Sequence, residues 1–444
     1  MDLIVKNGKI VNCDGEREAD IFVKNQKIET IAPNIQIENQ KIQTIDARGK
    51  YIFPGGIDPH VHHQLPTPAG PTSDDFYSGS RAALFGCTTT IIDFVTPHRG
   101  QSLTDALKAR LGEASKSIIN TRLHVSPVEW RSSTEGEILD CIQNHNIKSF
   151  KCYMAYKNNV GLDDDSLFKV MKVVGKAGGL VTLHCEDGDE IEKLRTKYFD
   201  ESLPGPEAHV KSRPPKLEAK AVKKAIGLAA KANCPIYIVH VSSAQSLQLI
   251  KAAQQAGQIV YAETCPQYLL LDQSKYLSEF EKAVAFVISP PLRNKEDNLA
   301  LWQALADGAV STVGTDHCPF MLSQKMAGKD DFRKIPNGAG GIEHRMALLY
   351  TYGVLENKID LKKFVEITST NAAKVFGLYP QKGIIAEGAD ADLVVWNPET
   401  ENTISVNTHH QNCDLNIYEG FKTKGTPEVV ILGGKVVLSL DGRG

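Results

Sequence analysis

The feature that most constrains the fold is a series of eight short apolar segments that begins near residue 55. Longer stretches with a helical pattern separate them, among them residues 166–176, 217–232 and 246–256. This alternation is typical of a parallel sheet with crossover helices, and eight such units match a (β/α)8 barrel. A doubly wound open sheet is the alternative, but no segment carries the G-x-G-x-x-G fingerprint that often accompanies it. The apolar segments are residues 56–58, 89–92, 122–125, 149–151, 180–183, 236–239, 259–262 and 311–314.

The two ends of the chain carry a different pattern, that of short β-hairpins. Residues 3–11 read as two strands joined by an Asn7-Gly8 turn, and residues 429–437 repeat the scheme with Gly433-Gly434. A further short strand is expected at 393–396. Because an isolated hairpin is marginal in water, we expect both ends to share one β domain rather than to form two unrelated hairpins.

The predicted fold class is therefore α/β, a (β/α)8 barrel with a small β-sandwich domain formed by both chain ends. The expected boundaries are 55–377 for the barrel, and 1–54 together with 378–444 for the β-sandwich domain.

Composition excludes several classes of protein. Hydrophobic residues make up 42% and charged residues 23%, which is typical of a globular chain. With 50 basic and 53 acidic residues the net charge is −3, so the sequence offers no basic footprint for nucleic acid or an anionic membrane. The nine cysteines are scattered without C-x-x-C spacing, and no segment reads as a signal peptide or a membrane span. We expect a cytoplasmic protein with reduced thiols.

Polar residues follow the apolar segments at the points where barrel active sites are built. His60 and His62 follow the first segment, and because they are two residues apart in extended chain they point to one face. Imidazole and carboxylate groups together are suited to zinc and similar divalent ions. The full set is His60, His62, Lys151, His184, His240 and Asp316.

Each of these signals is weak when it is taken alone. His184 or His240 alone is more often a hydrogen-bonded core residue, and Asp316 alone could cap the following helix. Their joint occurrence at one rim of one barrel favours a metal site. The remaining histidines near this rim are interpreted as structural or supporting: His63, His124, His317 and His344.

Lys151 does not fit a simple list of ligands. An ammonium buried among metal ligands costs several kcal/mol to desolvate. Burial favours the neutral amine, which is nucleophilic and adds CO2 to give an anionic carbamate with two ligand oxygens. The alternative is a lysine paired with an acid in the barrel core.

These residues and their surroundings resemble one family. The motifs are Gly55-Gly-Ile-Asp-Pro-His60, Thr88-Thr-Thr-Ile-Ile-Asp-Phe94, Phe150-Lys151-Cys-Tyr-Met-Ala-Tyr156, Ser212-Arg-Pro-Pro215, Glu263-Thr-Cys-Pro-Gln-Tyr268, Ser289-Pro-Pro-Leu-Arg293, Thr315-Asp316-His-Cys318, Ile335-Pro-Asn337-Gly338 and Glu387-Gly-Ala-Asp-Ala-Asp-Leu393. Together they resemble the dihydropyrimidinases and D-hydantoinases, cyclic amidohydrolases with a carboxylated lysine, through most of the chain.

The resemblance implies two divalent ions, usually zinc, and N6-carboxylation of Lys151. One ion would be held by His60, His62, Lys151 and Asp316, and the other by Lys151, His184 and His240, with a hydroxide between them as the nucleophile. Asp316 would carry the proton to the leaving ring nitrogen, and Tyr156 would bind the oxyanion unless it is only a packing aromatic. Backbone groups of Ser289 and Asn337 would bind the C(=O)–NH–C(=O) edge of the substrate.

The implied activity is ring opening of cyclic diamides, dihydropyrimidines such as dihydrouracil or hydantoins, to N-carbamoyl amino acids, as in pyrimidine catabolism. Dihydroorotases carry an Arg where this chain has Gln64, which argues against a ring acid. Allantoinase stays open, because it shares the ligand set. Collapsin response mediator proteins are non-enzymatic relatives that have lost ligands, whereas all six positions are filled here. A mononuclear deaminase carries a catalytic Glu in place of Lys151.

The chain departs from the family in its substrate loops, at residues 63–70 and 338–341. These loops shape the pocket for the ring substituent, which Leu65, Tyr153 and Val160 are expected to line. The substituent and its stereochemistry are therefore left open by the sequence. The resemblance also implies a homo-oligomer, commonly a tetramer.

Overall fold

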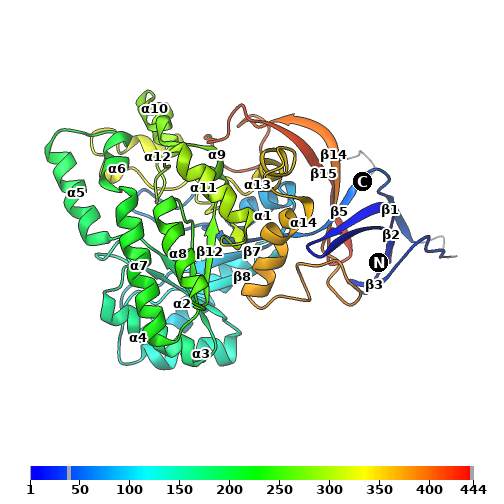
Figure 1. The fold of residues 1–444 in the computed structure, drawn as a ribbon, viewed down its shortest axis with the longest axis horizontal. Helices are drawn as coiled ribbons and strands as arrows, with labels where there is room; N and C mark the ends of the chain where they lie inside the picture. The colour runs from blue at the N-terminus through cyan, green and yellow to red at the C-terminus, as the bar shows by residue number, and fades with distance from the viewer. Residues whose placement is uncertain (1, 38–41, 441–444) are drawn as a thin grey trace.

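The eight apolar segments form the barrel that the sequence predicts. In the computed structural model, which describes residues 2–37 and 42–440, they make one parallel sheet of eight strands in sequential order (Figure 1). The strands are β6 (Gly56–Val61), β7 (Thr88–Val95), β8 (Asn120–Val125), β9 (Ser149–Tyr153), β10 (Leu180–His184), β11 (Ile236–Ile238), β12 (Val260–Thr264) and β13 (Thr312–Val313).

Helices connect successive strands and cover the outside of the barrel. In α4 the buried residues Leu167, Val170, Met171 and Val174 recur at helical spacing and face the sheet. The α-helices are α1 (Phe76–Phe85), α2 (Leu103–Ala114), α3 (Thr134–His145), α4 (Asp164–Lys176), α5 (Gly188–Asp200), α6 (Pro206–Ser212), α7 (Pro215–Ala232), α8 (Ala244–Gln255), α9 (Pro266–Leu270), α10 (Phe280–Ala283), α11 (Lys295–Ala306), α12 (Leu322–Met326), α13 (Arg345–Leu349), α14 (Leu361–Val365) and α15 (Asn371–Val375). Short 3-10 turns occur at η1 (Gln273–Leu277), η2 (Val284–Phe286) and η3 (Phe332–Lys334), and π-helical turns at η4 (Tyr350–Val354) and η5 (Glu366–Thr370).

A buried arginine joins the first and last strands of the barrel. The guanidinium of Arg345 donates to the carbonyl oxygens of Ile57 and Val313, each at 2.8 Å, and to Thr88 Oγ1 at 3.1 Å. Val61 also pairs with His317 just beyond β13. Because β13 is only two residues long, these contacts hold the seam of the barrel where the ladder of backbone hydrogen bonds is short.

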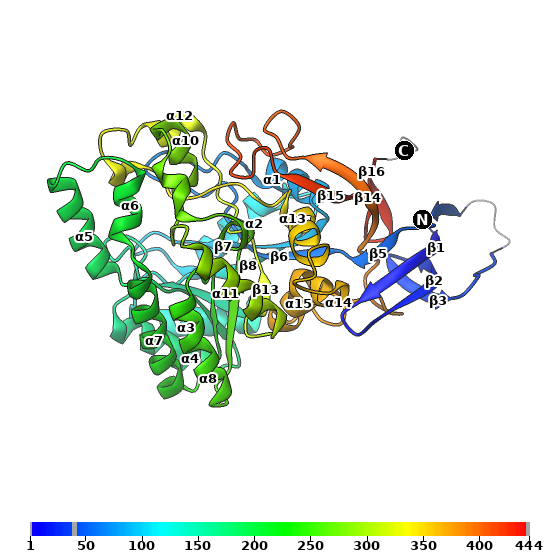
Figure 2. The same cartoon turned by 45° about the horizontal axis from the view of Figure 1, so that its top comes forward.

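Both ends of the chain share a second sheet, as expected. Its order is β16-β15-β14-β5-β1-β2-β3, with β4 paired to β1, and it lies to one side of the barrel (Figure 2). Its strands bury a hydrophobic cluster of their own. The hairpin at Gly433-Gly434 is confirmed. The strands are β1 (Leu3–Asn12), β2 (Gly15–Lys24), β3 (Lys27–Ala32), β4 (Gln43–Asp46), β5 (Tyr51–Pro54), β14 (Leu393–Thr403), β15 (Lys422–Leu432) and β16 (Lys435–Ser439).

The predicted hairpin at Asn7-Gly8 is wrong. Strand β1 runs through these residues, and the register against β2 shifts there, which makes a bulge instead of a turn. Asn7 has φ +62° and its amides donate to Asp20 and Asp46. A Cβ on Gly8 would lie 2.4 Å from Ile52 Cδ1, so close packing against β5 requires glycine.

Two further observations concern thiols and membranes. All nine cysteines are free. Among the described helices, none combines the length and the apolar character needed to cross a membrane.

Arg345→Met tests the seam of the barrel. The change removes the side-chain donors from the buried carbonyls of Ile57 and Val313, and we expect the free energy of unfolding to fall by about 2–4 kcal/mol. Urea denaturation measures the loss. The exposed Arg17 gives a matched control, and Arg17→Met should change stability by less than about 0.5 kcal/mol. Equal losses in the two variants would contradict the role of Arg345.

Candidate active site

One cavity at the carboxyl ends of the barrel strands contains all nine of the predicted site residues. Its volume is about 510 Å³. Leu65, Tyr153 and Val160, which were expected near the ring substituent, also line it. The nine residues are His60, His62, Lys151, Tyr156, His184, His240, Ser289, Asp316 and Asn337.

His60, His62 and Asp316 converge at the end of β6. The Nε2 atoms of both imidazoles lie 3.1 Å from Asp316 Oδ1. The three residues form a group whose ligand atoms lie within 4.8 Å of one another and could hold a metal ion. Asp316 reaches this position with φ +52°, because β13 has ended and the chain turns sharply toward the rim.

His184 and His240 form a second group beside the first. Their facing nitrogens, Nδ1 of His184 and Nε2 of His240, are 2.9 Å apart. Nε2 of His184 lies 2.9 Å from a carboxylate oxygen of Glu186. A carboxylate only accepts, so this contact places the His184 proton on Nε2 and leaves the Nδ1 lone pair free to face His240.

Lys151 lines the same cavity as these two groups and is 1% exposed. Its Nζ is 5.0 Å from the ring centroid of Phe94 and 5.1 Å from that of Tyr153. In residues 2–37 and 42–440 the ammonium has neither a hydrogen bond nor an ion pair. Burial lowers the pKa of Lys151 to about 8, and the core salt bridge weighed as an alternative is absent among these residues.

The charges of the site favour metal ligation. Burial lowers the pKa values of His60, His184 and His240, so these imidazoles are neutral at neutral pH, as ligands must be. Burial alone would raise the pKa of Asp316, but His60 and His62 outweigh it and bring the pKa to about 2. The site therefore offers neutral nitrogens and one carboxylate, a donor set that fits a divalent ion.

A buried carboxylate behind the ligands was missed by the sequence reasoning. Glu263 lies 2.6 Å from His60 Nδ1 and accepts hydrogen bonds from the His240 amide at 3.1 Å and the Tyr237 hydroxyl at 2.7 Å. It thereby orients His60 so that Nε2 faces Asp316. Burial raises the pKa of Glu263 to about 7. The motif that begins at Glu263 was noticed, but not its role, because strand periodicity does not show which neighbour a side chain meets.

Glu186 has a parallel role on the other side of the site. It pairs with Arg213 at 2.5 Å, and both side chains are 1% exposed. The Arg213 guanidinium also lies 5.6 Å from the ring centroid of Tyr156. One buried ion pair thus orients His184 and supports the tyrosine that faces the cavity.

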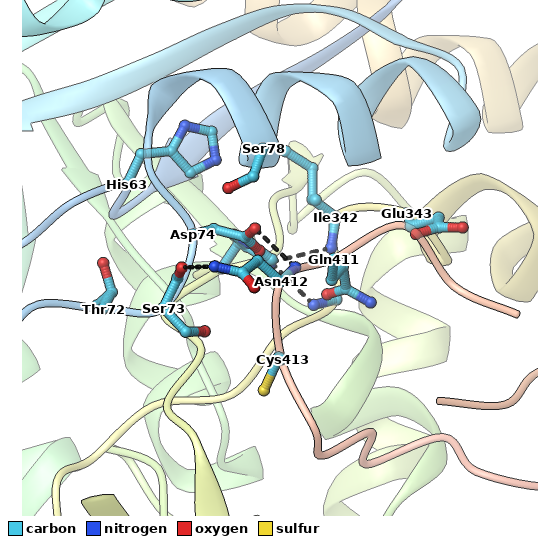
Figure 3. Close-up of polar contacts among 12 residues, drawn as sticks. His63, Thr72, Ser73, Asp74, Ser78, Ile342, Glu343, Gln411, Asn412 and Cys413 are labelled. Carbon is cyan, nitrogen blue, oxygen red and sulfur yellow. Dashed lines mark hydrogen bonds and ion pairs between the residues drawn. The ribbon is translucent and has the colours of Figure 1, made fainter. Parts of the chain in front are cut away.

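The loop after β6 is anchored by residues from distant parts of the chain. Asp74 pairs with His317 Nε2 at 2.9 Å, and the His62 amide donates to the carbonyl of His317. Figure 3 shows Asn412 beside this loop, where its amide donates to Asp74 and its carboxamide to the carbonyl of Ser73. A segment near the C-terminus therefore holds the loop that carries His62.

Ser289 and Asn337 present unengaged polar groups to the cavity. Within the part of the chain that the structure describes, neither residue's backbone N–H or C=O bonds to another protein group, and Ser289 Oγ is buried without a partner. Tyr156 lies with its ring centroid 5.3 Å from that of His184. All three residues are thus positioned to contact a molecule inside the cavity.

The other histidines are placed as structural or supporting residues. His124 contacts Ser149 and the carbonyl of Pro59, and His344 contacts Gln411 and Asn416. His63 is fully buried, and neither ring nitrogen has a partner among the described residues. None of these histidines lines the cavity.

A parallel eight-stranded barrel whose rim gathers imidazoles and a carboxylate that could hold a metal ion has the architecture of a barrel hydrolase. Comparison with known proteins specifies it further: a sequence model described as Amidohydrolase family matches residues 51–437, and the chain belongs to this family.

Relatives and solved structures similar to the chain carry two related names. The chain is 42% identical to a D-hydantoinase of Geobacillus stearothermophilus, over 99% of this chain and 93% of the relative. It is 39% identical to a dihydropyrimidinase of Rattus norvegicus, over 98% and 85%. A crystal structure of dihydropyrimidinase from Brevibacillus agri NCHU1002 superposes with a TM-score of 0.97 at 40% identity, covering 99% of this chain and 95% of that one.

Glu263→Gln tests the support behind the metal site. The amide cannot accept from His60, His240 and Tyr237 as the carboxylate does, and we expect metal affinity to fall about 10- to 100-fold. Metal content after graded chelator dialysis measures the change. Glu281→Gln, at an exposed position, is the matched control; unchanged retention in Glu263→Gln would refute the support role.

Buried neutral histidines predict how stability depends on pH. Burial lowers the pKa of His124 and His209 to about 3 and that of His344 to about 4. Below pH 6.5 the unfolded chain therefore binds protons that the folded protein does not. As the pH is lowered, the free energy of unfolding decreases by about 1.4 kcal/mol per pH unit for each such group. Above pH 6.5 these groups have no effect.

Unfolding by urea between pH 6.5 and 4 checks this expectation. His209→Gln should reduce the slope of unfolding free energy against pH by about one proton, or roughly 1.4 kcal/mol per unit. His98→Gln, at an exposed histidine, should leave the slope unchanged. A slope in His209→Gln equal to that of the wild type would show that His209 does not stay neutral in the fold.

Proposed function

We propose that the protein hydrolyses the ring amide of cyclic diamides, dihydropyrimidines such as dihydrouracil or hydantoins, to N-carbamoyl amino acids. The observation that carries the proposal is the amine of Lys151, which is buried in the same cavity as the two groups of imidazoles and has no hydrogen bond or ion pair among the described residues. The names of the similar proteins, D-hydantoinase and dihydropyrimidinase, support the same reaction.

The proposed cofactor is a pair of divalent ions, with zinc the expected metal. His60, His62 and Asp316 would hold one ion, and His184 and His240 the other. Lys151, as an N6-carboxylated carbamate formed with CO2, would ligate both. Bound there, the ions supply a water of lowered pKa and polarise the ring carbonyl.

The remaining roles belong to the side chains and backbone of this chain. Asp316 is a carboxylate at neutral pH, with its pKa near 2, and would accept a proton at Oδ1 and return it to the leaving nitrogen. Tyr156 would donate its hydroxyl to the developing oxyanion. The free backbone groups of Ser289 and Asn337 would bind the C(=O)–NH–C(=O) edge and orient the ring.

The substrate is tested by a ring-opening assay with dihydrouracil, hydantoin, allantoin and dihydroorotate in parallel. The protein is supplied with zinc and bicarbonate. Turnover of dihydrouracil or hydantoin above dihydroorotate is expected, because Gln64 supplies no cation for a ring carboxylate. Turnover of these rings above allantoin is expected from the names of the similar proteins. Faster opening of allantoin would reassign the substrate, and bound metal without any turnover would disprove the substrate class.

We further propose how the chain is organised in the cell. The boundaries are 55–377 for the catalytic barrel, and 1–54 with 378–444 for the other domain, supported by the separate hydrophobic cluster of the terminal sheet. A homotetramer is expected from the resemblance to the family. Nine free cysteines support a reducing, cytoplasmic location. Light scattering and cell fractionation test these two expectations.

Lys151→Ala tests the carbamate. Without the shared ligand we expect loss of metal from the site and a fall in activity below about 1% of wild type. Metal analysis and the ring-opening assay measure both. Added short-chain carboxylic acids should restore part of each, because they replace the missing carboxylate. Lys148→Ala, at an exposed lysine, is the control; full activity of Lys151→Ala without added acid would exclude the carbamate.

A further inference from the structure

A second buried lysine lies outside the ring of proposed ligands. Lys325, on the short helix α12, is 1% exposed. Its Nζ donates to the carbonyl oxygen of Val287 at 3.0 Å and to that of Pro336 at 3.1 Å. Among the described residues it has no carboxylate partner. Its Nζ also lies 5.9 Å from the ring centroid of Phe320. Burying an ammonium or amine without a carboxylate partner costs free energy, so the two hydrogen bonds to carbonyl oxygens call for an explanation.

The two carbonyls belong to the two segments that carry Ser289 and Asn337, whose backbone groups face the cavity. Val287 precedes Ser289 by two residues, and Pro336 directly precedes Asn337. The same Val287 carbonyl also accepts from the Gly338 amide at 3.0 Å. Lys325 therefore bonds to both segments beside the backbone hydrogen bond between Val287 and Gly338.

The neighbouring carbonyls of the first segment are also engaged. His209 Nε2 lies 2.7 Å from the carbonyl of Ile288, and the Tyr268 hydroxyl donates to that of Pro290 at 2.6 Å. Ser289 thus lies between fixed residues while its own groups stay open. In the second segment, Gly338 adopts φ +157°, and a Cβ there would lie 2.3 Å from the carbonyl oxygen of Cys318.

We propose that Lys325 is a positioning residue that sets the spacing of the Ser289 and Asn337 backbone groups and thereby the recognition of the C(=O)–NH–C(=O) edge. The inference deepens the proposed function and depends on it for the ligand. One nitrogen bonded to both segments fixes their separation, which independent side chains would not do. Burial lowers the pKa of Lys325 to about 7, although Cys318 and Cys413 act in the opposite direction. Two N–H donors remain in either protonation state, so the contact does not require the charge.

Lys325→Met is the test, because methionine keeps the length of the stem and removes both donors. The probes are uracil, which has the intact edge, and 3-methyluracil, in which a methyl group blocks the ring N–H. Calorimetry on zinc-loaded protein should show wild type favouring uracil. In Lys325→Met the affinity for uracil should fall about tenfold, the worth of about one hydrogen bond, and the two affinities should converge. KM for the ring substrate should rise more than kcat falls, with metal content unchanged.

The matched control is Lys329→Met, at an exposed lysine three residues past helix α12, which should retain the wild-type preference. Amide hydrogen exchange gives a second measurement: peptides covering 286–290 and 335–340 should exchange at least about tenfold faster in Lys325→Met, with other barrel peptides unchanged. Lys325→Arg keeps donors in a wider fork. In Lys325→Arg, both the amide exchange rates and the preference for uracil over 3-methyluracil should lie between those of wild type and Lys325→Met. This variant replaces Lys325→Met in the test if the methionine variant does not fold.

The outcomes distinguish a failure of the role of Lys325 from a failure of the proposed function. Unchanged discrimination in Lys325→Met overturns the proposal, whether exchange is faster or not, since a merely structural lysine would loosen the segments without altering recognition. If wild type opens no ring and does not distinguish the two probes, the proposed function fails and recognition by Lys325 fails with it. Ring opening by wild type together with unchanged discrimination in the variant rejects the role of Lys325 alone.

Discussion

The mouth of the barrel is organised around Lys151, which is buried and has no charged partner among the residues that the structure describes. Other buried charges nearby are satisfied: Glu186 by Arg213, and the guanidinium of Arg345 by backbone carbonyls. Burial penalises the charged form of such an amine and lowers the pKa of Lys151 to about 8. The same surroundings keep the imidazoles neutral, so one constraint, exclusion of water, prepares both the lysine and the histidines for metal.

Around Lys151, polar groups that are hydrogen-bonded within the protein lie next to polar groups that face the cavity. Glu263 and Glu186 occupy the outer nitrogens of His60 and His184, which leaves the inner nitrogens facing the cavity. The same arrangement recurs in the backbone, where the carbonyls of Ile288 and Pro290 are bonded, whereas that of Ser289 has no partner among the described residues. In both cases buried partners on one side give direction to a polar group on the other.

The sequence predicted the elements that depend on local pattern. All eight barrel strands and the hairpin at Gly433-Gly434 were located, because apolar runs and turn residues act within a few positions of one another. The Asn7-Gly8 turn failed for a tertiary reason: Ile52 packs on Gly8, and Asp20 and Asp46 hold Asn7 in a bulge. The same two residues that favour a turn also suit a bulge, and only the partner strands distinguish them.

By itself the sequence determined the barrel, the shared terminal sheet and the set of residues that gather at the rim, since parallel strands bring their carboxyl ends together in any such fold. It did not determine the supporting contacts. Glu263 meets His60 across 203 positions of chain, and Lys325 meets Val287 across 38. The periodicity of the sequence does not predict such contacts, because they depend on how loops of different length pack over the barrel. The tertiary structure alone decided which nitrogen of each histidine faces the cavity and which backbone groups remain open there.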